Sequence, residues 1–144
     1  MGDLKALIRY HRWQLDEKRR EVADLNAMLD RLHEQQTALE AEITAEQQAA
    51  RSHGDVAFSY ASFAQQALRR RRAVAGAIAQ VEGQIALATD VLRDMFQEVK
   101  RYELAQDERT RQEKAKLRHR ENAMLDEVAA MGFERRRQNR DASE

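Results

Sequence analysis

The chain of 144 residues is 42% hydrophobic, 35% charged and only 6% aromatic, and it contains neither proline nor cysteine. This composition is typical of long helices or a coiled coil and argues against a compact core with strands. The zero net charge disfavours a dedicated nucleic-acid binder, and the lack of cysteine excludes disulfides and thiolate metal sites. No apolar run reaches the length of a membrane span or resembles a signal peptide, so we expect a soluble cytoplasmic protein.

A first helix is expected over residues 3–52, with Asp3 as its N-cap. Alternating steps of four and three residues select a row in which ten of fourteen members are apolar: Leu4, Ile8, His11, Leu15, Lys18, Val22, Leu25, Leu29, Leu32, Gln36, Leu39, Ile43, Glu46 and Ala50. A mean spacing of 3.5 residues over this length indicates a left-handed coiled coil.

A turn is expected over residues 53–56. Gly54 can adopt the left-handed conformation that ends a helix, and Asp55 is a suitable N-cap for the next one. The simplest construction is therefore a helical hairpin. The alternative is a pair of chains that associate as straight parallel helices, which would place Gly54 inside a helix at a cost of about 1 kcal/mol.

A second helix is expected over residues 57–138. Its row contains twelve apolar or aromatic members out of fourteen: Tyr60, Ala64, Ala67, Arg71, Val74, Ile78, Val81, Ile85, Ala88, Leu92, Met95, Val99, Tyr102 and Gln106. In an antiparallel hairpin each residue of the first row faces one residue of the second, and each such pair forms one layer of the seam. The two rows match when the two residue numbers in every layer add up to 110, which places Leu39 opposite Arg71. We therefore expect an all-α fold and a single domain over residues 1–144, a long antiparallel two-helix coiled-coil hairpin whose C-terminal helix overhangs the N-terminal one.

Four consecutive arginines lie in the second helix at positions 69–72. Successive residues of a helix are about 100° apart, so they cannot form one basic face. Arg71 falls on the seam, and we expect its guanidinium to extend toward Glu40 or Glu42. The other three point outward, where they could meet an acidic partner.

The overhang, from about Asp107 onward, lacks a partner within the chain. Opposite charges three and four residues apart can support a solvated helix there. Apolar residues then return and need a surface that buries them: Leu117, Met124, Leu125, Val128, Met131 and Phe133. The last residues are expected to fray after Gly132.

No catalytic, nucleotide-binding or metal-binding motif occurs, and the four histidines are not paired at helical spacing. A two-stranded rod also offers no enclosed pocket. We therefore expect no enzymatic activity, cofactor, metal or small-molecule substrate. The second arm carries 17 basic and 14 acidic residues, an excess of three, which predicts only weak, nonspecific nucleic-acid binding.

Aromatic residues outside the seam have two interpretations each. Trp13 can lie over the groove beside basic side chains, or it can anchor a partner. Phe58, Tyr60 and Phe63 can close the end of the hairpin, or they can form a partner surface.

Four segments resemble the FliJ family, the small coiled-coil component of the flagellar type III export apparatus: LKALIRYHRWQLDEKRR, YASFAQQALRRRRAVAGAI, LRDMFQEVKRYE and ENAMLDEVAAMGFERR. The best matching positions are Tyr60–Phe63, Lys100–Tyr102–Glu103 and Leu125–Asp126–Glu127. The resemblance covers nearly the whole chain. It implies an antiparallel hairpin similar to the rotor stalk of rotary ATP synthases.

The resemblance also implies partners. One end of the protein would enter the hexameric export ATPase and promote ring assembly, through Leu4, Ile8, Trp13, Leu117, Leu125, Val128, Met131 and Phe133. The hairpin tip would bind the export-gate membrane protein through Tyr60, Phe63, Ala67 and Arg70, although alanines at Ala45, Ala49 and Ala67 make this surface less bulky than in the family. Some members also handle export chaperones. The expected location is the cytoplasm, peripherally attached to the inner membrane; the alternative function is a generic homodimeric coiled-coil scaffold or chaperone.

Overall fold

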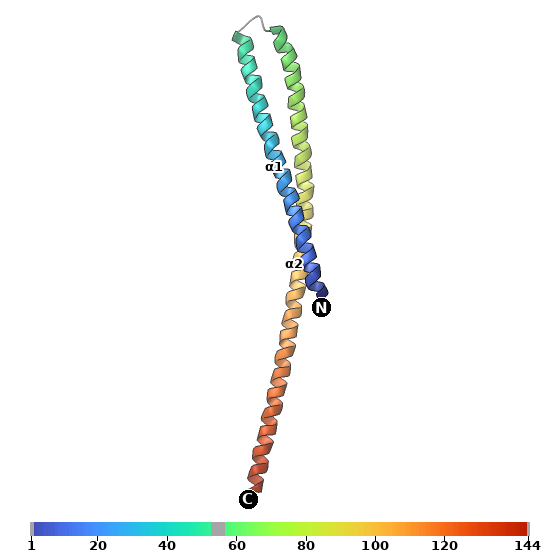
Figure 1. Cartoon of the computed structure of the whole chain (residues 1–144), viewed down its shortest axis with the longest axis vertical. Coiled ribbons are helices and arrows are strands. Elements are labelled where there is room, and N and C mark those ends of the chain that lie inside the picture. Colours follow the sequence, from blue (N-terminus) through green and yellow to red (C-terminus); the bar gives the residue numbers. More distant parts are fainter. Residues whose placement is uncertain (1, 53–56, 144) are drawn as a thin grey trace. The chain divides into compact units, whose positions relative to one another are not determined.

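The computed structural model describes residues 2–52 and 57–143, which form two long helices. Helix α1 spans Gly2–Ser52 and helix α2 spans Ala57–Ala142 (Figure 1). The expected all-α two-helix hairpin is thereby confirmed. The turn expected over residues 53–56, with Gly54 and Asp55 as capping residues, lies outside the described residues.

Both helices extend further than the sequence pattern suggests. Helix α1 begins at Gly2, so Asp3 lies in its first turn and is not its N-cap. In the first turn the negative charge of Asp3 interacts favourably with the positive end of the helix dipole. Helix α2 continues through Gly132 to Ala142, four residues beyond the expected end. One glycine costs a helix only about 1 kcal/mol, and the arginines and glutamate that follow it are good helix formers.

The chain divides into two compact units. The hairpin unit comprises Arg9–Glu98, and the terminal unit comprises Met1–Ile8 together with Val99–Glu144. Within the hairpin unit, α1 and α2 lie side by side and run in opposite directions (Figure 1). No helix in the described part of the chain is long and apolar enough to cross a membrane.

The hairpin unit is held together along the predicted seam. Its buried side chains all belong to the two rows: Leu15, Leu39, Ile43, Ala67, Ile78, Val81 and Ala88. Leu39, Ile43 and Ala67 form one cluster, and Phe63 packs against it. The numbers of Ile43 and Ala67 add up to 110, as the predicted pairing requires.

Two seam positions are exposed, Glu46 and Arg71. Both carry charged side chains, which reach water more readily than they pack between two helices. The remaining members of the two rows in the hairpin unit are buried or half-buried, so the seam is continuous apart from these two layers.

In the terminal unit, pairing of the two helices is confined to the beginning of α1. Ile8 and Val99 are buried, whereas Leu4, Tyr102 and Gln106 are half-buried. Farther along α2, Thr110 is still half-buried, but every residue from 111 to 131 is exposed. This exposed stretch is the overhang expected from the unequal helix lengths.

Candidate partner-binding surfaces

The exposed part of α2 carries an apolar row, which we name the tail stripe: Leu117, Met124, Val128 and Met131. All four side chains are more than half exposed, as are the neighbouring Leu125 and Phe133. Positions 117, 124 and 131 recur every seven residues, and residue 128 lies four after 124, so the row follows one face of the helix. Large apolar side chains that gather on one face are typical of a protein-binding surface.

The tail stripe does not continue the seam in phase. The four-three alternation of the seam would lead from Gln106 to Arg109, Glu113 and Lys116, all of which are polar. The stripe is reached by a second step of four residues, from Gln106 to Thr110, because Leu117 lies seven residues after Thr110. The Thr110 hydroxyl donates a hydrogen bond to the Gln106 carbonyl at 3.0 Å. Four extra residues in a heptad pattern are a stutter, which locally unwinds a coiled coil.

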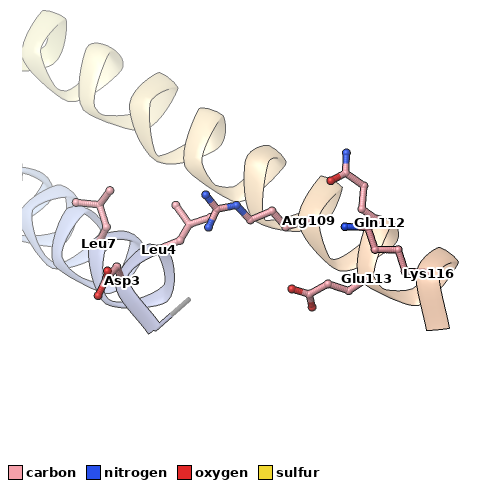
Figure 2. Close-up of a pocket in the computed structure, with 7 residues that line it drawn as sticks. All are labelled: Asp3, Leu4, Leu7, Arg109, Gln112, Glu113 and Lys116. Carbon is pink, nitrogen blue, oxygen red and sulfur yellow. The ribbon is translucent and has the colours of Figure 1, made fainter.

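A groove of about 560 Å³ lies where α1 begins against α2. It is lined by Asp3, Leu4, Leu7, Arg109, Gln112, Glu113 and Lys116. Figure 2 shows the Arg109 side chain extending from α2 toward Leu4. Two acidic and two basic side chains line the groove, so it does not favour one sign of charge, and its apolar lining comes from Leu4 and Leu7.

The residues expected to bind an ATPase divide into exposed and packed ones. The tail members are exposed, and the Trp13 side chain is 60% exposed. Leu4 is half-buried, and Ile8 retains only 6% exposure within the seam. Leu4 and Ile8 therefore contribute mainly to helix pairing, and Trp13 belongs to the other unit.

At the tip, the expected gate-binding residues are partly used for packing. Phe63 packs against the Leu39–Ile43–Ala67 cluster, and its ring centroid lies 6.5 Å from that of Tyr60. Ala67 is buried, whereas Tyr60 is half-buried. Of the two interpretations of these aromatics, closing the end of the hairpin accounts for Phe63; the side chain of Phe58 lies outside the described residues.

Two of the four arginines form ion pairs across the helices. Arg71 donates two hydrogen bonds to the Glu40 carboxylate, from Nε to Oε1 at 2.7 Å and from Nη2 to Oε2 at 2.8 Å. These bonds, together with the charge of Glu40, raise the pKa of Arg71. Arg70 lies 3.4 Å from Glu42. The expected reach of Arg71 to Glu40 is confirmed, and Arg70 stays exposed while it contacts α1.

A further apolar surface lies beside the seam of the hairpin unit. The Trp13 ring stacks on Tyr10, with ring centroids 6.5 Å apart and planes 26° apart. Trp13 also lines a groove of about 610 Å³ with Leu25, Met28 and Met95. A second hollow adjoins it around Leu25 and includes the exposed side chains of Leu87 and Val91. Sequence reasoning missed this surface because Leu87 and Val91 lie outside the seam; their spacing of four residues is the available signal.

These surfaces are suited to contact with other helices. Among the described residues, no group of three or more histidine or acidic side chains is placed to hold a metal ion. The grooves are shallow and lie along the helices, and their apolar side chains follow helical spacing. Such surfaces accept an amphipathic helix by the same packing that joins α1 to α2.

Comparison with known proteins agrees with the arrangement described above. The family model described as "Flagellar FliJ protein" matches residues 2–138, which is nearly the whole chain. No curated protein and no solved structure matches the chain significantly. The two helices, the heptad seam and the family match lead to one conclusion: the chain belongs to the FliJ family and is a flagellar protein related to the export apparatus.

Proposed function

We propose that this chain is the stalk and adaptor of a flagellar type III protein export apparatus. The FliJ family is a non-enzymatic family of flagellar proteins. In the proposed role the tail enters the hexameric export ATPase and promotes ring assembly, while the hairpin tip contacts the export-gate membrane protein. The protein would then work at the cytoplasmic face of the inner membrane, held there by the apparatus. Export chaperones are further candidate partners.

The tail stripe carries this proposal. All residues of α2 from 111 to 131 are exposed, yet they include Leu117, Leu125, Val128 and Met131. Exposing these side chains is unfavourable in water, and burying each against a partner would contribute up to about 1.5–3 kcal/mol. A ring that encloses one helix can contact apolar side chains on more than one of its faces, which suits Leu125 and Phe133 outside the stripe.

The test is to measure ATP hydrolysis and ring formation by the cognate export ATPase with and without this protein. We expect the full chain to stimulate both. Truncation after Gln106 should remove the stimulation because it removes the stripe. The double variant L125S/V128S should weaken it strongly while leaving the described seam intact.

The matched control is L104S. Leu104 is about as exposed as the tail residues but lies between Gln106 and Tyr102 in the paired part of α2, on the side away from the seam. This variant should stimulate the ATPase as well as the unchanged protein does. Equal stimulation by the truncated and full chains would refute the proposal.

The gate contact is supported by Arg70. Its ion pair with Glu42 is solvent-exposed on both sides and therefore contributes little to stability, so the guanidinium can turn to an acidic partner at small cost. We expect R70E to reduce capture of the cytoplasmic part of the gate protein in a pull-down. The control R93E, at another exposed arginine of α2, should leave capture unchanged. Unchanged capture by R70E would remove Arg70 from the contact.

A further inference from the structure

The tail stripe contains two of the five methionines of the chain, Met124 and Met131, which we name the tail methionines. Their side chains are 65% and 53% exposed. The two positions are seven residues apart, so they lie about two turns apart on one face of α2. Every residue from 111 to 131 is exposed. Small molecules dissolved in water can therefore reach both thioether side chains.

The methionines of the hairpin unit are more covered than the tail methionines. Met28 is 42% exposed and Met95 is half-buried, and both line the groove beside Trp13. Met1 lies outside the described residues. An oxidant must touch the sulfur of a methionine to react with it, so the reaction rate depends on exposure. We therefore expect the tail methionines to react before Met95.

The chain contains no cysteine, so the methionine thioethers are its only sulfur groups. In many proteins a cysteine thiolate reacts with oxidants first and shields the methionines, but no thiolate competes here. Oxidation of methionine to the sulfoxide can be reversed by methionine sulfoxide reductases. The exposed tail methionines are thus a candidate site of reversible covalent modification.

We propose that a peroxide oxidises Met124 and Met131 to sulfoxides and thereby switches off partner binding by the tail stripe. This inference rests on the proposed function of the tail. In each reaction the sulfur lone pair attacks one peroxide oxygen, a sulfur–oxygen bond forms and the oxygen–oxygen bond breaks. The sulfur loses two electrons, and the other peroxide oxygen leaves as water (or as an alcohol from an organic peroxide).

The physical effect of the two sulfoxides is to make one apolar face polar. A thioether can be buried against an apolar partner, whereas a buried sulfoxide oxygen needs a hydrogen bond that such a partner does not supply. Two sulfoxides on one face should therefore weaken the contact by about tenfold or more. The helix itself should be unaffected, because both side chains are exposed in the isolated protein.

The experiment treats the full chain with hydrogen peroxide until mass spectrometry finds one added oxygen on each tail methionine. After removal of the peroxide, stimulation of the cognate export ATPase is measured over a range of protein concentrations. We expect the concentration for half-maximal stimulation to rise about tenfold or more. Methionine sulfoxide reductases acting on both sulfoxide epimers, with a dithiol that becomes a disulfide as it supplies the electrons, should restore stimulation.

Two matched variants locate the effect, each compared with its own untreated sample. M124L/M131L should be insensitive to peroxide, since leucine has no sulfur, whereas M28L/M95L should remain sensitive. No stimulation by the untreated full chain would refute the proposed function together with this inference. If the untreated chain stimulates and the chain with both tail sulfoxides stimulates equally, only this inference is overturned. Equal sensitivity of M124L/M131L and the unchanged chain would also overturn it.

Discussion

At the scale of single residues, the arginine run shows how a seam accommodates charge. Arg71 occupies a seam layer, but its side chain leaves the interior and forms a two-point ion pair with Glu40. This behaviour could be predicted from the sequence because the heptad phase places Arg71 opposite Leu39 and close to Glu40. The pair between Arg70 and Glu42 was not predicted, since heptad phase alone does not fix the rotamers of flanking side chains.

We predict that R71L raises the midpoint of thermal unfolding by roughly 2–4 °C. The exposed ion pair contributes little, whereas leucine at this position would pack beside Leu39 and extend the apolar seam. Circular dichroism during heating measures the change. The control R69L replaces an arginine outside the seam and should leave the midpoint nearly unchanged. A lower midpoint for R71L would contradict the place of Arg71 in the seam.

At the scale of elements, α2 uses its apolar residues in two different ways. Near the tip they are packed, as at Ala67, which forms a cluster with Leu39 and Ile43 of α1. In the tail they are exposed, as at Leu125 and Val128. The packed and the exposed apolar residues of α2 both have helical spacing in the sequence. The length of α1 decides which of them pack against α1 and which stay exposed. The heptad rows therefore predicted the seam and the overhang.

The helix end and the groove were harder to predict. Gly132 suggested an early end, but α2 continues to Ala142 because no proline interrupts it and the neighbouring residues favour helix. The groove around Trp13 and Leu87 depends on how two helices approach each other on one side of the seam. The four-residue spacing of Leu87 and Val91 marks one side of the groove, but a residue pattern along one helix does not show which residues of the other helix lie across from it.

We expect L39A to lower the free energy of unfolding by about 2–4 kcal/mol, because it removes a buried side chain from the seam. L125A should change it by less than about 0.5 kcal/mol, since Leu125 has no packed surroundings in the tail. Urea unfolding followed by circular dichroism provides both values. Similar losses for the two variants would mean that the tail is buried in the isolated protein.

At the scale of the whole molecule, the chain consists of two units that differ in how their helices are supported. The hairpin unit has a continuous seam, whereas most of the terminal unit is helix without a packed neighbour. Ion pairs three residues apart, such as Arg111 with Glu108 at 3.1 Å, support such a helix only modestly. Local opening should therefore be easiest in the tail.

Limited trypsin digestion should reveal this difference. We expect the first cuts among the basic residues of 114–140, because cleavage requires local unfolding and the tail unfolds at the lowest cost. The arginines at 69–72 should resist longer, since they lie in the paired part of α2. Mass spectrometry over a time course identifies the cuts. Early cleavage at 69–72 would contradict this order of cleavage. The export ATPase, the proposed partner, should protect the tail from cleavage when it is added.

The stutter between Gln106 and Leu117 has a consequence for how the protein can evolve and be engineered. It separates two helix-binding faces that would otherwise share one phase. A substitution that changes packing along the seam does not have to change the tail stripe. Substitutions that adapt the tail stripe to a different partner do not have to change the packing of the hairpin. Free-energy changes from the two faces should thus be additive, although both faces lie on the same helix, α2.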